Sequence, residues 1–174
     1  DLNAESEISY KPLWWHISRD VELKGEAYFE VEKGSTFDVR SGEYTVSVLG
    51  TSFNIFSRDG KYNVTCLTGK VNVSDKLESV ILTPNMQALW NDGKLISKDI
   101  DDAKESINWK QGKFVFVGVP LYEVIQEIER QYDIEVLPNS NLDYLYSGNF
   151  TKAKNPDDVF KIVGKPFGIE FKIK

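Results

Sequence analysis

The sequence has few of the residues on which the commonest catalytic and metal sites depend. Its 174 residues include one cysteine, Cys66, one histidine, His16, and one methionine. A single cysteine excludes an internal disulfide and any cysteine-based zinc finger. A Ser/His/Asp or Cys/His catalytic set would have to recruit that one histidine, which lies far from Cys66 along the chain. We therefore expect a protein that is not an enzyme and that holds no metal or cofactor.

Long apolar runs and an excess of positive charge are missing as well. No stretch approaches the roughly 20 apolar residues that a membrane-spanning helix needs. The first residues contain no basic segment followed by an apolar one, so no signal peptide is predicted. The 21 basic and 27 acidic side chains give a net charge of −6, the wrong sign for a general nucleic-acid binder. The missing initiator methionine suggests a piece of a longer chain.

The first hundred residues do contain a regular alternation of apolar and polar side chains. Short alternating bursts run from Ala27 to about Ile96, separated by turns such as Ser41-Gly42 and Thr68-Gly69. A period of two places each apolar set on one face of a strand. Strands of this length with short glycine turns predict an all-β domain, either a sandwich, a barrel or a compact solenoid.

A charged stretch from Lys98 to Ser106 interrupts the alternation and is predicted to be a linker. It divides the chain into two domains, residues 1–105 and 106–174. The charge differs between the two halves. Residues 1–108 carry 18 acidic and 12 basic side chains, whereas residues 109–174 carry 9 of each. The whole net charge of −6 therefore belongs to the β half.

The second half changes period and predicts a small α/β domain of two helices, built as a repeated βαβ unit. A continuous apolar strand at 114–117 precedes Pro120, and apolar residues then recur at helical spacing from Leu121 to Tyr132. Asn155 and Pro156 are an N-cap and a first helical residue, which predicts the second helix. Further strands are expected at 133–137, 144–150 and 168–173. The whole chain is thus predicted to be mainly β plus α/β.

Several runs of residues resemble the FecR family of periplasmic sensors and anti-sigma regulators. In the first half they are Gly25-Glu-Ala-Tyr-Phe-Glu-Val31, Phe37-Asp-Val-Arg40, Val46-Ser-Val-Leu-Gly-Thr-Ser-Phe-Asn-Ile55 and Leu82-Thr-Pro-Asn-Met-Gln87. In the second half, Trp109-Lys-Gln-Gly-Lys-Phe-Val-Phe116, Tyr132-Asp-Ile134 and Gly168-Ile-Glu-Phe171 resemble the C-terminal domain of FecR-like proteins from the Bacteroidetes. That domain is similar to the short N-terminal domain of secretins and TonB-dependent transducers.

The resemblance implies a signalling role in the periplasm. Family members join a cytoplasmic segment that binds a sigma factor, one membrane helix and a periplasmic portion. The signalling domain of an outer-membrane TonB-dependent transducer contacts that portion and changes sigma-factor release. Neither the sigma-binding segment nor the membrane helix is recognisable in the 174 residues. The resemblance therefore implies a soluble periplasmic ectodomain that binds neither nucleic acid nor, by itself, the sigma factor.

We expect the transducer to add a strand to an exposed sheet edge of the second domain. The candidate contact residues are Ile134, Glu135 and Val136 on one strand, and Tyr144 and Tyr146 on another. The alternative that both tyrosines only cover the core stays open.

Two other functions remain open. A carbohydrate-binding module would need two tryptophans, from Trp14, Trp15 and Trp90, on one concave face. A periplasmic assembly scaffold would use the second domain to form oligomers.

Overall fold

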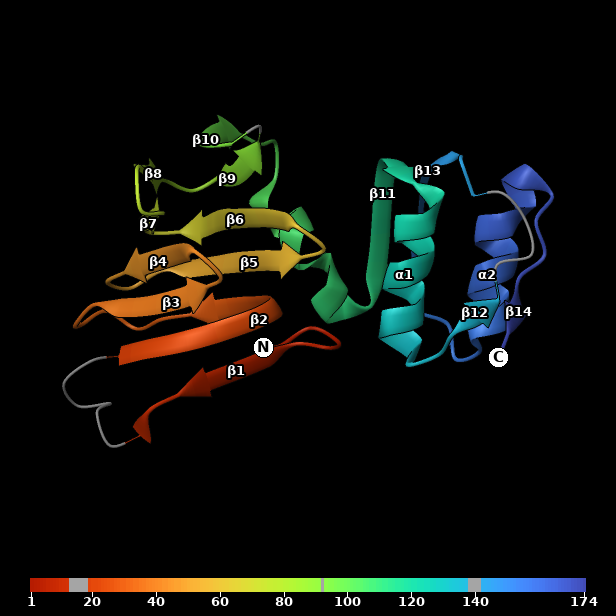
Figure 1. Ribbon diagram of the computed structural model, residues 1–174, viewed down its shortest axis with the longest axis horizontal. Coiled ribbons are helices and arrows are strands. Elements are labelled where there is room, and N and C mark those ends of the chain that lie inside the picture. Colours follow the sequence, from red (N-terminus) through yellow and green to blue (C-terminus); the bar gives the residue numbers. More distant parts are fainter. Residues whose placement is uncertain (13–18, 92, 138–141) are drawn as a thin grey trace. The chain divides into compact units, whose positions relative to one another are not determined.

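The computed structural model describes residues 1–12, 19–91, 93–137 and 142–174 (Figure 1). The chain divides into two compact units, Asp1–Ile107 and Asn108–Lys174. The division falls two residues beyond the predicted boundary. Each unit has a hydrophobic core made of its own residues. The segment predicted as a linker is ordered, because it contains the end of a strand and a 3-10 helix, η2 (Ala103–Gln111), that bends at Ile107.

The first unit contains ten strands and no α-helix among its described residues, so it is mainly β as predicted. The strands are β1 (Glu7–Tyr10), β2 (Arg19–Glu30), β3 (Phe37–Ser41), β4 (Tyr44–Val48), β5 (Ser52–Arg58), β6 (Lys61–Thr68), β7 (Val71–Ser74), β8 (Ser79–Leu82), β9 (Met86–Asn91) and β10 (Lys94–Asp99). They form one sheet in the order β10-β9-β6-β5-β2-β3-β4-β7-β8, with β1 added to β2. All these neighbours are antiparallel except β2 and β3.

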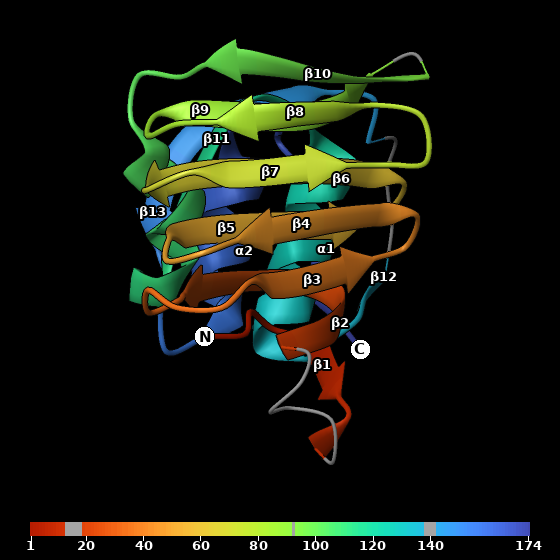
Figure 2. The same ribbon diagram turned by 90° about the vertical axis from the view of Figure 1, so that its left-hand side faces the viewer.

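Strand β2 belongs to both halves of this sheet and lets it fold back on itself. Its first residues, from Arg19, pair with β3, and its later residues, from Gly25, pair with β5. Gly25 lies at the change with φ +94°, and a Cβ there would stand 2.6 Å from the Ser6 hydroxyl. Only glycine fits both the backbone angle and the close approach. Figure 2 shows the two resulting layers, with β3, β4, β7 and β8 stacked in front of β5, β6 and β9.

Alternating side chains from both layers fill the space between them. The most completely buried are Phe53, Leu23, Ile55, Leu82, Val39, Val46, Val64, Val71 and Val73. Cys66 is also fully buried within this core, in phase with Val64, as the alternation predicts. Trp90 packs partly buried against the same core, and its ring centroid lies 5.6 Å from that of Tyr44.

The second unit runs strand–helix–strand twice. Its elements are β11 (Lys113–Pro120), α1 (Leu121–Tyr132), β12 (Val136–Leu137), β13 (Leu145–Thr151), α2 (Pro156–Gly164), the 3-10 turn η3 (Lys165–Phe167) and β14 (Lys172–Ile173). The strands pair between the two repeats, β11 with β13 and β12 with β14, both antiparallel. β12 and β14 have two residues each, so the strands expected at 133–137 and 168–173 are much shorter than predicted.

Both helices bury one apolar face against these small sheets. Their buried residues are Leu121, Val124, Ile125, Ile128, Val159, Phe160 and Val163. In α2 the Asn155 side chain accepts a hydrogen bond from the Asp157 N–H at 3.0 Å, and Pro156 is the first helical residue, as predicted. No helix among the described residues is long and apolar enough to cross a membrane.

Candidate docking site

The edge at Ile134–Val136 is one of the two predicted docking strands. Antiparallel pairing continues from β12 and β14 to the bond from the Lys174 N–H to the Glu135 carbonyl, 2.9 Å. The alternation of the ladder turns the N–H groups of Ile134 and Val136 the other way, toward the open side. Both are already occupied by one residue of α1. The Ile134 N–H donates to the Glu129 carbonyl (3.2 Å), and the Val136 N–H donates to Glu129 Oε1 (2.6 Å). An added strand would find no unused donor here.

Glu135, the remaining residue of that strand, lies exposed and forms an ion pair with Lys174 at 2.8 Å. The Lys174 ammonium lowers the pKa of the Glu135 carboxyl, first through their hydrogen bond and then through its charge. The same contact raises the pKa of Lys174. Both side chains are largely exposed, so the pair contributes little to stability.

The second predicted pair, Tyr144 and Tyr146, separates into one exposed and one buried ring. Tyr146 is only 4% exposed and lies edge-on to Phe116, with centroids 6.1 Å apart. Burial raises the pKa of its hydroxyl. Its position matches the alternative in which the ring covers the core. Tyr144 is 43% exposed and stacks on Phe167 at 4.7 Å.

Strand β13, next to Tyr144, offers a different kind of edge. Among the described strands it pairs only with β11. The Lys152 N–H bonds to the Gly112 carbonyl at 2.7 Å, and Val115 lies opposite Asn149. In an antiparallel ladder this register turns the N–H and C=O of Asn149 away from β11. The same alternation turns those of Val115 away from β13, so each strand has one open edge.

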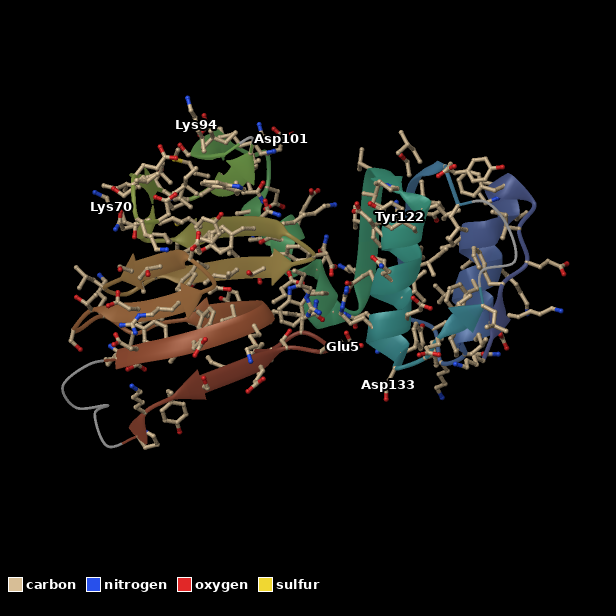
Figure 3. The ribbon with its side chains drawn as sticks, viewed as in Figure 1. Glu5, Lys70, Lys94, Asp101, Tyr122 and Asp133 are labelled. Carbon is tan, nitrogen blue, oxygen red and sulfur yellow. The ribbon has the colours of Figure 1, made fainter. Side chains whose placement is uncertain are left out.

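Apolar side chains are exposed on this small sheet. Val117 is 82% exposed and Leu145 is 69% exposed, whereas Phe114 and Tyr146 on the other face are buried. In Figure 3, Tyr122 lies on the neighbouring helix α1, where its side chain is half exposed. Leu145 and Tyr144 therefore place apolar surface directly beside the open edge of β13. The sequence pattern predicted Tyr144 as a contact residue but not Leu145. Only the β11–β13 register shows that Leu145 lies on the solvent-exposed face of the sheet.

Other candidate chemistry is not brought together by the fold. Among the described residues no group of three or more His, Cys, Asp or Glu side chains could hold a metal ion. His16, Trp14 and Trp15 lie outside the described residues. Trp90 packs on the β core, and Trp109 is partly buried in the second unit, so the described tryptophans do not supply the exposed pair that a sugar-binding face would need.

Comparison with known families assigns both units. Residues 1–72 match the model of the FecR protein family, and residues 113–174 match the model of the FecR C-terminal domain. A crystal structure at 1.65 Å of a candidate anti-sigma factor from Parabacteroides distasonis ATCC 8503 is 30% identical, with a TM-score of 0.82. The alignment covers 99% of this chain and 88% of that one.

A second crystal structure from the same organism, at 2.50 Å and also described as a candidate anti-sigma factor, is 32% identical with a TM-score of 0.83. It is covered to 83%, and this chain to 98%. The chain belongs to the FecR family. This FecR-family chain therefore has the fold of sigma-factor regulators over nearly its whole length, in agreement with the resemblance. No curated protein matches it.

Proposed function

We propose that this FecR-family chain is the periplasmic sensing portion of a membrane-anchored sigma regulator. It receives its signal by direct contact with the signalling domain of an outer-membrane TonB-dependent transducer. The observation that carries the proposal is the match of residues 1–72 and 113–174 to the FecR and FecR C-terminal family models, together with the similarity of 99% of the chain to a candidate anti-sigma factor. The sigma factor would be bound by a cytoplasmic segment outside these residues, so the activity of this portion is protein recognition.

The contact surface is the open edge of β13 in the second unit. Short sheets leave edges whose main-chain groups can pair with another strand. Glu129 occupies the corresponding donors beside β12, so β13 is the better acceptor of an added strand. Exposed Tyr144 and Leu145 lie at the start of this edge and supply apolar area for the partner. Strand addition combines main-chain hydrogen bonds with side-chain contacts beside the paired strands.

A proline substitution tests this assignment, with a control on the opposite strand. Asn149→Pro removes one N–H that points away from β11 and leaves the β11–β13 bonds in place. Val115→Pro removes the equivalent outward N–H from β11, directly opposite. We expect Asn149→Pro to weaken binding to the isolated signalling domain of a TonB-dependent transducer from the same organism about tenfold or more, and Val115→Pro to change it less than about threefold.

The measurement is isothermal titration calorimetry of the whole chain, with amide NMR spectra confirming that each variant keeps its fold. Equal losses in the two variants would contradict docking at β13 without excluding the contact itself. Chemical-shift changes confined to the first unit would contradict the second unit as the docking module. If the transducer domain does not bind the chain at all, and light scattering finds oligomers instead, the assembly-scaffold alternative takes the place of the sensor.

A further inference from the structure

A groove of about 650 Å³ crosses the first unit where β4 ends and β7 begins. The strand register aligns Ser47, Asn72 and Ile81 in one row across β4, β7 and β8. Ile81 is 64% exposed, and Leu49, just after β4, is 62% exposed. The floor of the groove is thus formed by two exposed aliphatic side chains and two small polar ones.

Two lysines lie at the rim of this groove, one held by Gly50. Gly50 has φ +155°, and a Cβ there would stand 2.6 Å from Cγ and 2.7 Å from Cα of Lys33. Any larger residue would push the Lys33 main chain away. The Gly34 N–H also donates to the Leu49 carbonyl at 3.0 Å, which fixes the segment that carries Lys33. The backbone of this lysine is therefore positioned by the groove wall itself.

The second lysine is held from the other side by Thr51. The Thr51 hydroxyl donates to the Lys70 carbonyl at 2.9 Å, and Thr51 is only 3% exposed. A Cβ on Gly69 would stand 2.7 Å from the same hydroxyl, so that approach also requires glycine. Figure 3 shows Lys70 projecting from the sheet. One three-residue segment, Leu49–Thr51, therefore sets the place of both lysine backbones.

The charge of the groove is opposite to that of the unit around it. The first unit carries all of the chain's net charge of −6. Two other lysines of this unit form ion pairs, Lys24 with Glu7 and Lys76 with Glu43. Within the described residues neither Lys33 nor Lys70 has an ion-pair partner. Two unneutralised ammonium groups beside apolar surface favour a ligand that combines carboxylates with aliphatic groups.

We propose that this groove binds an extended acidic segment of a partner protein. Carboxylates of the segment pair with Lys33 and Lys70, and an aliphatic side chain between them packs on Leu49 and Ile81. Ser47 and Asn72 can hydrogen-bond the main chain of the segment. No aromatic side chain is among the described residues that line the groove, so it lacks the stacking platform of a sugar or nucleobase site.

The test uses the whole chain and the peptide acetyl-Glu-Val-Asp-Leu-Glu-amide, with acetyl-Lys-Val-Lys-Leu-Lys-amide as its charge-reversed control. Amide NMR titration reports both the site and the affinity. The variant Lys33→Glu/Lys70→Glu is compared with Lys94→Glu/Lys98→Glu, which makes the same change in net charge on exposed β10. We expect the first variant to weaken binding of the acidic peptide about tenfold or more and the second less than about threefold.

Four outcomes would overturn the proposal. If both double variants bind the acidic peptide equally weakly, the loss of affinity comes from the change in net charge and not from the groove. Shifts away from residues 33–36, 47–51 and 70–72, or no binding at millimolar peptide, would remove the site. Lysine-dependent binding of octanoate in place of the peptide would assign the groove to a small anionic amphiphile.

Discussion

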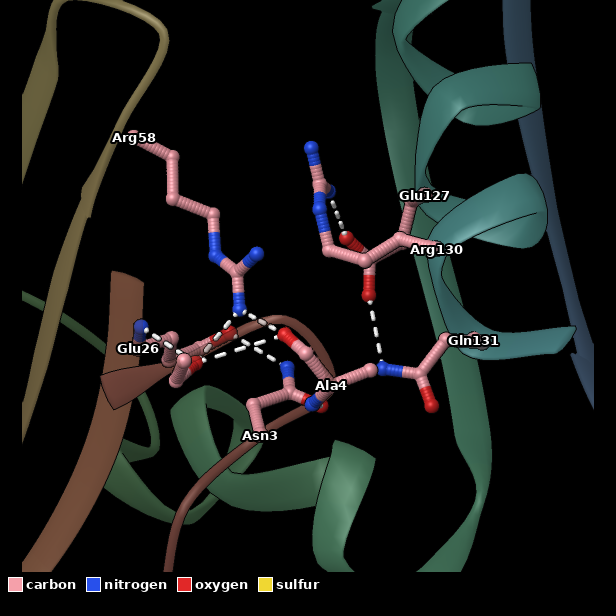
Figure 4. A network of polar contacts seen from close by, with 8 residues as sticks. Asn3, Ala4, Glu26, Arg58, Glu127, Arg130 and Gln131 are labelled. Carbon is pink, nitrogen blue, oxygen red and sulfur yellow. Dashed lines mark hydrogen bonds and ion pairs between the residues drawn. The ribbon is translucent and has the colours of Figure 1, made fainter. Parts of the chain in front are cut away.

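A buried carboxylate holds the N-terminal segment on the first unit. Glu26 is only 7% exposed and accepts hydrogen bonds from the side-chain amides of Asn3 (2.7 Å) and Asn54 (2.9 Å). Its own N–H donates to the Ser6 hydroxyl at 3.0 Å, and Arg58 bonds the same hydroxyl at 2.7 Å (Figure 4). A carboxylate out of water needs such donors, because losing them costs the full desolvation of the charge.

Glu26→Ala should therefore destabilise the first unit strongly. The substitution leaves two buried amides without their acceptor, for an expected loss of about 2–4 kcal/mol. Glu30→Ala, an exposed position on the same strand, is the matched control and should stay within about 0.5 kcal/mol. The free energy of unfolding of each variant is measured by urea denaturation, and the local stability of residues 1–10 and 19–30 is measured by amide hydrogen exchange. Equal effects would show that the Asn3–Glu26–Asn54 cluster adds no stability.

The buried thiol of Cys66 gives a prediction about pH. Burial raises its pKa from 9.0 to about 11, so about 0.1% is thiolate at pH 8. The folded chain should react with a disulfide reagent at least about a hundredfold more slowly than the chain in urea. The pKa of the Cys66 thiol is higher in the folded chain than in the unfolded chain, so keeping this thiol protonated favours folding. The folded chain is therefore fully stable in this respect below pH 9, and it loses stability as the pH rises from 9 toward 11. Rapid labelling of the folded chain at pH 8 would contradict the burial of Cys66.

At the scale of elements, α2 is stabilised by its first residues. The Asn155 side chain caps the Asp157 N–H, and two carboxylates, Asp157 and Asp158, lie in the first turn. Negative charge there interacts favourably with the helix dipole. Helix α1 has no such side-chain cap and begins directly after Pro120. The start of α2 is thus the more sensitive of the two to substitution.

Asn155→Ala should lower the stability of the second unit by about 1 kcal/mol. For a unit of this size that corresponds to a fall in Tm of about 4–8 °C. Asn155→Asp keeps an acceptor at the cap and is the control, with a Tm at or above that of the parent chain. Thermal melts by circular dichroism at 222 nm report the helices. A melt of the alanine variant that overlays the parent would contradict a stabilising cap.

Local sequence patterns correctly predicted the helices α1 and α2, which are determined by contacts between residues close together in the sequence. The apolar spacing of α1 and the Asn155-Pro156 start of α2 are local, and both helices form where expected. The strands expected at 133–137 and 168–173 shrink to two residues each, because few of their main-chain groups find a partner strand. Which strands pair between the two repeats depends on contacts between residues distant in the sequence, and the local hydrophobic periodicity does not predict such contacts.

The candidate sites show the same division. Tyr144 was predicted as a contact residue because of its residue type. Glu129 has the spacing of an exposed helix residue, and its hydrogen bond from the Val136 N–H is a tertiary contact that the sequence pattern does not show. Lys33 and Lys70 are far apart in the sequence and come to one groove only through Gly50 and Thr51. The run at residues 46–55, around Gly50, is one of those that resemble the FecR family. Its role in positioning Lys33 and Lys70 is visible only in the folded structure.

At the scale of the whole chain, the two units have separate cores and different charge. The first unit carries the net charge of −6, and the second is neutral. The buried residues that form the second core cluster, from Leu121 to Val163, all belong to the second unit. Within α1 a largely buried ion pair joins Arg130 to Glu127 at 2.6 Å, and the Gln131 side-chain amide donates to the same carboxylate (Figure 4). The second unit thus has the internal contacts of an independent domain.

We therefore expect residues 108–174 to fold without the rest of the chain. A unit this small is marginal, so its stability should depend on each core residue. Its amide NMR spectrum should overlay the matching signals of the whole chain. In the whole chain, Val124→Asp should unfold the second unit alone, because it puts a charge among Leu121, Ile128 and Val159. Loss of the signals of the first unit in that variant would show that the two units fold as one, and the transducer contact would then have to be tested on the intact chain only.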